Sequence, residues 1–368
     1  MFKINKKSVF VVDIGSLKLS MLYGTCQNGK AVVLGQSEVG YEGYMDGEFL
    51  DEDSLKSHIQ NLVSAIEVNC GVSVKALTVS VPAEFSYSLT KKVNVTFASQ
   101  TKITEEILDE IYASAVENID GYYPLSTQPI VTTLGDGKKV ISALNHKTLR
   151  LTAQVNVIYA KQTFIKLLNQ VFASIGISSV KYVSAPLVTN QICFKNTAQS
   201  VCVLDVGYLS TTLTVFKGKG LEHVFCFSMG GGQIEVDLMD SFALTLKEAR
   251  ELKRNIVLSL ITLNAEFYET SNLGKTRKIL THSANEVVKN RLEELAFVVN
   301  ECLKKVEAPE YLTIYLTGGG ISQIQGAKQF LENSLNRNVQ LLTSDFLGFN
   351  KPFQTSLISL FLSQISSQ

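Results

Sequence analysis

The sequence predicts a mixed α/β protein made of two copies of one half-domain, with a smaller α+β segment inserted into the first copy. Two segments share the order apolar strand, Asp-x-Gly turn, second apolar strand: Val9–Gly24 and Val201–Phe216. A third strand and then a helical stretch follow each of them, so the whole pattern repeats. Between the copies, Phe85–Tyr159 has the alternating apolar residues of antiparallel strands around one helix.

This pattern sets the expected domain boundaries. A chain of 368 residues is long enough for several separate cores. We expect the first half-domain at residues 1–84 and 160–198, the insertion at 85–159, and the second half-domain at 199–368. Within the second half-domain, residues 245–300 are expected to form a small subdomain of helices and strands.

The first half-domain is expected to continue its hairpin into a mixed layer of strands covered by helices. Apolar residues at helical spacing predict the helix Asp53–Asn69, and Gly176 marks the end of another helix. The expected elements are the strands Ala31–Ser37, Ala76–Pro82 and Ser179–Val183, the helices Asp53–Asn69 and Lys161–Ser174, and a helix beginning near Pro186.

The insertion is predicted to be a compact α+β unit without chemistry of its own. Thr104 followed by two glutamates predicts the start of an amphipathic helix, Thr104–Asn118. Alternating residues predict strands at Lys91–Phe97, Pro129–Leu134 and Leu149–Tyr159. We interpret this segment as a docking surface.

The second half-domain adds two glycine runs to its hairpin. Met229 and three glycines end the expected strand Leu221–Ser228 and lead into a helix, Ile234–Phe242. Thr245–Asn255 is predicted to be an amphipathic charged helix. Tyr311–Asn333 is predicted to contain a buried strand, a Gly318-Gly319-Gly320 turn and a helix beginning near Ile324.

Composition excludes several classes of function. With 34 basic and 34 acidic residues, the chain has no net charge that would favour nucleic acid. The six cysteines contain no CxxC pair and are expected to be reduced core residues. The apolar stretch near the N-terminus, before Asp13, is too short for a signal peptide or a membrane-spanning helix. We therefore expect a soluble intracellular protein.

The paired turns predict a phosphate site. Turns built on Gly15 and Gly207 let backbone N–H groups approach phosphate oxygens without a Cβ in the way. Ser16 and Ser210 can add hydroxyl donors. The carboxylates that precede these glycines would repel phosphate directly. We therefore expect them to hold a hydrated Mg²⁺ or to orient water, and they are the candidate catalytic residues: Asp13 and Asp205.

The glycine runs predict the rest of this site. Glycines before a helix leave N–H groups for an anion or a ribose, and those after a buried strand permit close approach of an adenine ring. Lys253, with Arg250 or Glu248, would reach the ribose and base; the alternative is that this helix is a solvated charged face. No GKS or GKT follows a glycine run and no GxGxxG is present, so the P-loop and Rossmann classes are disfavoured.

These motifs, in this order, resemble the actin-like (ribonuclease-H-like) ATPase superfamily, and within it the bacterial cell-division protein FtsA. The resemblance spans essentially the whole chain. The matching phrases are D-I-G-S-x-K at Asp13–Lys18, R-L-x-A-x-V-x-V-I at Arg150–Ile158, M-G-G-x-x-I-x-x-D at Met229–Asp237, K-E-A-x-x-x-K at Lys247–Lys253 and L-T-G-G-G at Leu316–Gly320.

The resemblance implies an ATP-binding, filament-forming adaptor that links the tubulin-like protein FtsZ to the membrane at the division site, on its cytoplasmic side. The implied partners are the FtsZ C-terminal peptide, further copies of the chain and, through the insertion, other division proteins. ATP with Mg²⁺ is the implied cofactor. The residues implied around it are Asp13, Gly15, Ser16, Lys18, Asp205, Gly207, Ser210, Thr211, Gly230, Gly231, Arg250, Lys253, Gly318, Gly319 and Gly320.

The second phosphate loop departs from the family pattern. The family usually has D-[IV]-G-G-G-T-T-D here, whereas Tyr208 and Leu209 replace glycines and Thr212 stands at the position of a carboxylate. Bulky side chains narrow a phosphate cradle. We therefore expect weaker nucleotide binding than in the family, and at most a slow ATPase.

Two further departures concern the end of the chain and the partners. Pro352–Gln368 is predicted to be the last helix of the fold, without the basic face of a membrane anchor, so either the chain is shortened or it is anchored differently. Tyr122–Lys139 lacks the acidic and glycine-rich residues expected of the family, which makes partner specificity the least transferable property.

Three alternatives stay open at this point. One is a pilus-assembly adaptor similar to PilM, which shares the insertion, and another is a structural homologue that binds no nucleotide. A metabolic kinase is disfavoured, because it would need a catalytic base near the cleft and a substrate pocket in place of the insertion, and we find no convincing Asp or His there. The four histidines are dispersed: His58, His146, His223 and His282.

Overall fold

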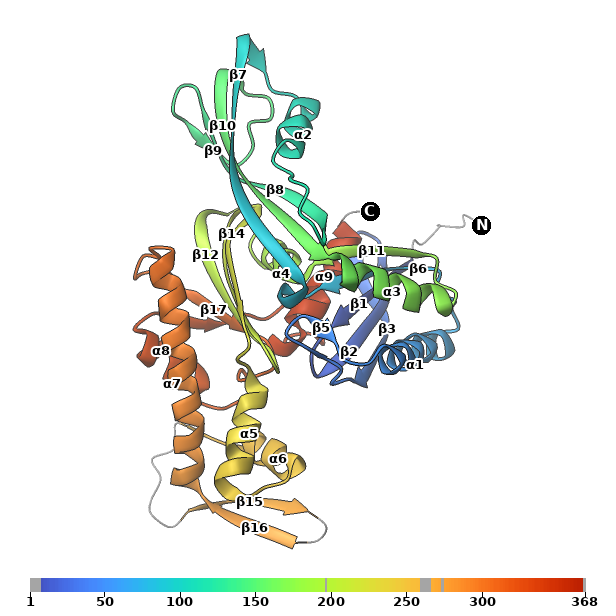
Figure 1. The fold of residues 1–368 in the computed structure, drawn as a ribbon, viewed down its shortest axis with the longest axis vertical. Coiled ribbons are helices and arrows are strands. Elements are labelled where there is room, and N and C mark those ends of the chain that lie inside the picture. The colour runs from blue at the N-terminus through green and yellow to red at the C-terminus, as the bar shows by residue number, and fades with distance from the viewer. Residues whose placement is uncertain (1–7, 196, 259–265, 273–274, 367–368) are drawn as a thin grey trace. The chain divides into compact units, whose positions relative to one another are not determined.

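The computed structural model describes residues 8–195, 197–258, 266–272 and 275–366. These residues form two compact units (Figure 1). The first unit comprises Met1–Val201, Thr214–Val224 and Ser356–Gln368, and the second comprises Cys202–Leu213 and Phe225–Thr355.

A five-stranded sheet is the centre of the first unit. The strands β1 (Ser8–Ile14), β2 (Lys18–Gln27) and β3 (Lys30–Gly40) are antiparallel. Next to β1, β6 (Ala76–Val81) and β11 (Ser179–Ser184) continue the sheet in parallel, which gives the order β11-β6-β1-β2-β3. The turn between β2 and β3 is Asn-Gly with both φ angles positive, the conformation that a tight hairpin requires.

Helices cover this sheet as the apolar spacing predicts. They are α1 (Glu52–Cys70), α3 (Gln162–Ser174), α4 (Ala185–Cys193) and α9 (Thr355–Ser366). Asp51 caps the N-terminus of α1 by accepting from the Ser54 N–H, and Gly71 ends the helix with φ of 63°. Small elements complete the unit: β4 (Tyr44–Met45), β5 (Glu48–Phe49) and a 3₁₀ turn at Ala83–Phe85.

The inserted segment folds as one antiparallel sheet with a helix. Its strands are β7 (Ser86–Lys102), β8 (Tyr122–Leu134), β9 (Lys139–Val140) and β10 (Lys147–Lys161), in the order β7-β10-β8-β9. The expectation of a helix to Asn118 was wrong, because α2 (Glu105–Ala113) ends five residues earlier. Beyond it, the Glu117 N–H donates to the Tyr159 hydroxyl, a bond that holds the chain in a non-helical course.

The second sheet repeats the first. Its order is β14-β13-β12-β17-β18, which matches β3-β2-β1-β6-β11 strand for strand. The strands β12, β17 and β18 run in parallel, as do β1, β6 and β11. The bounds are β12 (Thr197–Val206), β13 (Thr211–Gly218), β14 (Gly220–Phe227), β17 (Ile314–Thr317) and β18 (Val339–Leu341). The duplication expected from the sequence is confirmed.

The second unit also contains four helices and a hairpin within the described residues. The helices are α5 (Gly231–Phe242), α6 (Leu246–Asn255), α7 (Thr281–Lys305) and α8 (Ala327–Leu335); the hairpin is β15 (Phe267–Asn272) and β16 (Lys275–Leu280), and a 3₁₀ turn spans Pro352–Gln354. Helix α8 begins later than Ile324 because Gly326, with φ of 89°, does not continue a helix.

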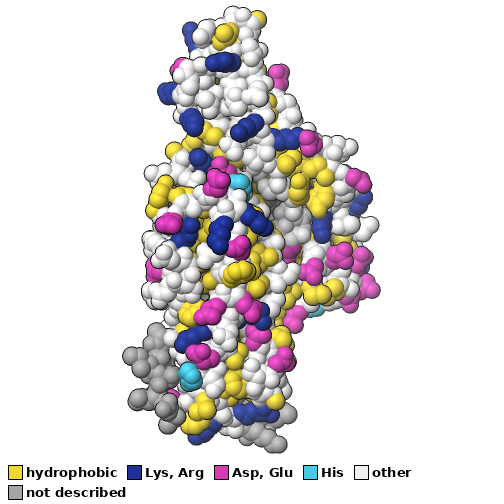
Figure 2. Space-filling model, turned by 60° about the vertical axis from the view of Figure 1, so that its left-hand side comes forward, with side chains coloured by type: hydrophobic (Ala, Val, Ile, Leu, Met, Phe, Trp, Pro, Cys, Tyr) yellow, Lys and Arg dark blue, Asp and Glu magenta, His cyan; other side chains and the backbone are white. Residues whose placement is uncertain are grey.

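The surface has no dominant charge. Figure 2 shows basic and acidic side chains mixed over most of the face that it displays, in keeping with equal numbers of each. Among residues 8–366 that the structure describes, no helix is both long enough and apolar enough to cross a bilayer.

Candidate functional site

The first Asp-x-Gly turn connects β1 to β2 as predicted. The Gly15 N–H donates to the Lys18 carbonyl at 3.1 Å, which closes the turn. A Cβ on Gly15 would lie 2.8 Å from that carbonyl oxygen, so the turn requires glycine. Ser16 is buried, and its hydroxyl bonds the Tyr44 hydroxyl.

The carboxyl group of Asp13 is held by two serines of the same unit. Its Oδ1 accepts from the Ser80 hydroxyl at 2.6 Å and from the Ser356 hydroxyl of α9 at 3.1 Å. Burial raises the pKa of Asp13 above its ordinary value, and the two hydroxyls and Lys18 offset only part of this rise. Burial therefore disfavours the charged form of this carboxyl group, the form that attracts a hydrated cation.

Lys18 is paired within its own sheet. Its ammonium lies 2.6 Å from the Glu38 carboxylate, which also accepts from Ser20 at 3.4 Å. This ion pair spans neighbouring strands β2 and β3. A phosphate would have to compete with Glu38 for the lysine.

The second turn has the same closure as the first. Gly207 donates its N–H to the Ser210 carbonyl at 2.8 Å, the counterpart of the bond from Gly15 to Lys18. Thr211 is buried and its hydroxyl donates to the Met229 carbonyl. The predicted equivalence of the two turns thus extends to their hydrogen bonds.

Both glycine runs converge on this second turn. The Gly231 N–H donates to the Gly207 carbonyl at 2.9 Å, and the Gly320 N–H donates to the Val206 carbonyl at 2.8 Å. A Cβ on Gly318 would lie 2.3 Å from the Asp205 carboxylate, so that side chain lies against the glycine. The structure therefore brings together most predicted residues of the second unit: Asp205, Gly207, Gly230, Gly231, Lys253, Gly318 and Gly320.

Gly319 lies at the margin of this cluster, where the nearest atom to an added Cβ belongs to Phe353, 3.3 Å away. The remaining predicted residues lie in the other unit: Asp13, Gly15, Ser16 and Lys18. That the two turns share one ligand stays a prediction.

Glu235 of α5 is the residue that sequence reasoning missed. This residue is only 5% exposed. Its carboxylate accepts hydrogen bonds from Arg250 Nε at 2.9 Å and from Lys253 Nζ at 3.2 Å. The available signal was the spacing of Arg250 and Lys253, three residues apart on one helix face, which predicts a shared carboxylate. Asp237, which the sequence singled out, instead pairs with Arg291 at 2.7 and 2.8 Å.

Burial dominates the electrostatics of Lys253. Its ammonium is almost fully covered and donates to the Gly231 carbonyl at 2.6 Å. Desolvation lowers the pKa of Lys253, while the neighbouring Glu235 carboxylate opposes the shift. Arg250 and Lys253 thus already have partners inside the protein. The alternative prediction, that they belong to a solvated charged face of the helix, is wrong for both residues.

A cavity of about 590 Å³ lies under the β15–β16 hairpin. Its lining is mostly apolar and includes Phe242, Leu244, Phe267, Ile279 and Leu280. Two basic side chains, Arg277 and Lys278, also line it. Such a lining suits a short peptide that offers an apolar side chain and a carboxylate.

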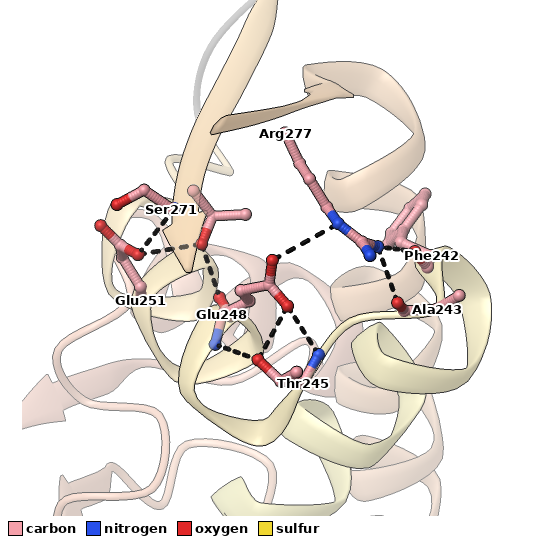
Figure 3. A network of polar contacts seen from close by, with 8 residues as sticks. Phe242, Ala243, Thr245, Glu248, Glu251, Ser271 and Arg277 are labelled. Carbon is pink, nitrogen blue, oxygen red and sulfur yellow. Dashed lines mark hydrogen bonds and ion pairs between the residues drawn. The ribbon is translucent and has the colours of Figure 1, made fainter. Parts of the chain in front are cut away.

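A polar network (Figure 3) includes Phe242 and Arg277, two residues that also line this cavity. Glu248 accepts from the Thr245 N–H at 2.8 Å and from its hydroxyl at 2.7 Å, which makes a capping box at the start of α6. Arg277 lies 3.4 Å from Glu248 and donates to the Ala243 carbonyl at 2.7 Å. Glu251 accepts from Thr270 at 2.9 Å, so β15 and β16 are both tied to α6.

Binding of a hydrated Mg²⁺ by Asp13 and Asp205 stays a prediction. Within the described ranges, no group of three or more His, Cys, Asp or Glu residues is placed to hold a metal ion. The two candidate carboxylates, Asp13 and Asp205, lie in different units.

Comparison with known proteins finds similarity to one family of cell-division proteins. The family model described as "Cell division protein FtsA" matches residues 202–359. The FtsA of Bacillus subtilis (strain 168) is 20% identical over 95% of this chain and 82% of its own length. The FtsA of Neisseria meningitidis serogroup B is 22% identical over 89% of this chain and 81% of its own length.

Solved structures with the same fold cover nearly the whole chain. The PilM–PilN type IV pilus biogenesis complex gives a TM-score of 0.67 at 15% identity, covering 97% of this chain and 98% of its own. MreB5 of Spiroplasma citri bound to ADP gives 0.56 at 11% identity, covering 98% and 97%. A MamK double helical filament gives 0.56 at 15% identity, covering 97% and 98%.

Two sheets of one strand order, each with a glycine turn after its first strand, define an actin-like fold. Its fold relatives include proteins solved with ADP and with AMPPNP. Within that class the chain is similar to the FtsA cell-division proteins, at 20% identity over 95% of its length for the FtsA of Bacillus subtilis.

Proposed function

We propose that this chain is an actin-like cytoskeletal adaptor of bacterial cell division, which self-associates into filaments and links FtsZ to the membrane at the division site. The similarity to FtsA over 95% of the chain is the observation that carries the proposal. The filament solved for a protein of the same fold supports self-association. In this role the protein would work at the inner face of the cell membrane.

The proposed partner on the FtsZ side is its C-terminal peptide, and the cavity under β15 and β16 is the proposed place for it. The apolar lining would receive an apolar side chain, and Lys278 at 64% side-chain exposure would attract a carboxylate. Other division proteins would bind the inserted sheet.

ATP with Mg²⁺ is the proposed ligand class, bound weakly. The residues as arranged fit it poorly, because glycine N–H groups of both turns, Arg250 and Lys253 already have partners, and because burial disfavours the charged form of Asp13. We therefore expect an ATPase that is slow at most.

Co-sedimentation with FtsZ polymers, and binding of the labelled FtsZ C-terminal peptide, test the proposal. Wild-type protein is expected to pellet with FtsZ and to bind the peptide. Lys278→Glu is expected to weaken peptide binding up to about tenfold, since it replaces an attraction by a repulsion. The matched control is Lys304→Glu, another exposed lysine paired with a glutamate, which should bind like wild type.

A PilM-like pilus adaptor is the second candidate, favoured by the TM-score of 0.67 to the PilM–PilN complex. The second candidate would replace the first if the wild-type protein binds neither FtsZ nor its peptide. It should then bind a peptide from a membrane partner of pilus assembly.

A further inference from the structure

The donors that open α5 are all used inside the chain. The Gly230 N–H donates to the Gln233 side chain at 2.7 Å, the Gly231 N–H to the Gly207 carbonyl at 2.9 Å, and the Gly232 N–H to the Tyr208 carbonyl at 2.7 Å. A helix N-terminus ordinarily leaves such groups for an anion. Here the second turn itself supplies two of the three acceptors.

The Tyr208 side chain lies against the first turn of the same helix. A Cβ on Gly232 would lie 3.2 and 3.3 Å from two carbons of the tyrosine ring. This distance shows that the ring packs directly on the glycine backbone, in space that the usual family glycine at position 208 leaves open.

The hydroxyl of Tyr208 joins the two charged helices. It donates to Glu235 of α5 at 3.1 Å and accepts from Arg250 of α6 at 2.8 Å. The Arg250 guanidinium also lies 5.4 Å from the centre of the ring, within the range of a cation–π contact. With the bond from Arg250 to Glu235 at 2.9 Å, the three side chains form a closed ring of contacts.

We propose that Tyr208 is an internal competitor for the nucleotide and determines the nucleotide affinity of this chain. This inference rests on the proposed function, which assigns the second turn and the start of α5 to a nucleoside triphosphate. The tyrosine ring takes the space beside Gly232, and its hydroxyl engages Arg250 and Glu235. A nucleotide enters this corner only when the side chain leaves it. The tie between α5 and α6 is therefore made without nucleotide.

Equilibrium binding of a fluorescent ATP analogue with Mg²⁺ tests the proposal. Tyr208→Ala is expected to bind at least about tenfold more tightly than wild type, because a nucleotide no longer has to break hydrogen bonds to two charged groups. Tyr208→Phe keeps the ring and loses only the hydroxyl bonds, so its affinity should lie between the two. Tyr311→Ala removes an exposed tyrosine of the same unit and should leave the affinity unchanged.

Equal affinities of wild type, Tyr208→Ala and Tyr208→Phe would overturn the proposal. If Tyr208→Ala melts too low to be measured, Tyr208→Phe decides alone: an affinity equal to that of wild type refutes the competition. Failure to pellet with FtsZ while the Tyr208 variants still gain nucleotide affinity would refute only the adaptor function.

Discussion

At the scale of single residues, Asp13 shows that the surroundings of a motif residue determine its hydrogen bonds and its pKa. The D-I-G-S phrase predicted a carboxylate that holds a hydrated cation. In the fold, two serine hydroxyls reach its Oδ1, and burial raises its pKa. Ser80 and Ser356 are 67 and 343 residues away in sequence, so no local pattern could predict either contact.

This environment predicts how stability depends on pH. Because the pKa of Asp13 is raised in the folded state, its contribution to stability is complete below the ordinary pKa and is lost as the pH rises through the raised value. Asp13→Asn is permanently neutral and keeps an oxygen for both serines. The melting temperature of the variant minus that of wild type should therefore increase from pH 4 to pH 8, as measured by scanning calorimetry.

The matched control is Asp240→Asn, an exposed aspartate of α5, for which the same difference should stay flat. A difference for Asp13→Asn that shrinks as the pH rises would contradict the assignment of a raised pKa.

The glycines were the part of the candidate site most open to prediction, because each one reflects a backbone requirement visible in the sequence. Gly15, Gly207 and Gly318 all lie where a Cβ would meet a backbone or carboxylate oxygen at 3.0 Å or less. Side-chain partners were harder, since Tyr208, Glu235 and Arg250 meet across 15 to 42 residues.

At the scale of elements, the capping box of α6 predicts a measurable cost. Thr245→Ala removes the hydroxyl that caps the Glu248 N–H and should lower the free energy of unfolding by about 1 kcal/mol. Urea denaturation measures this loss, and hydrogen exchange should rise first at residues 246–249. Thr245→Ser retains the hydroxyl and should restore most of the stability; a serine variant as weak as alanine would argue against capping.

Elements whose ends are marked by a glycine or a proline were predicted well, and elements whose length depends on distant contacts were not. Gly176 and Pro186 marked the end of α3 and the start of α4 correctly. The strand β7 spans Ser86–Lys102, well beyond the predicted seven residues, because it pairs with β10 along its length and the paired residues include polar ones. Such pairing depends on contacts between distant parts of the chain, which a local sequence pattern does not reveal.

At the scale of the whole molecule, α9 closes the first unit from the far end of the chain. Phe361 is fully buried, and its ring lies where a Cβ on Gly24 of β2 would come within 2.5 Å. Phe361→Ala should cost about 3 to 5 kcal/mol in unfolding free energy, the usual loss for a buried phenylalanine. Hydrogen exchange should rise in β1 and β2 and stay unchanged in α7.

The control for that variant is Leu347→Ala, which alters a side chain that is 94% exposed and should leave stability unchanged. Equal exchange in β2 for wild type and Phe361→Ala would show that α9 does not support the first sheet.

The position of α9 also has a consequence for the order in which the chain matures on the ribosome. Residues 8–195 emerge early, yet Asp13 and Gly24 await contacts from Ser356 and Phe361, and Ser356 follows Asp13 by 343 residues. The second unit ends at Thr355 and has all of its own residues before then. The unit that is synthesised first therefore completes its contacts only after the second unit has been synthesised.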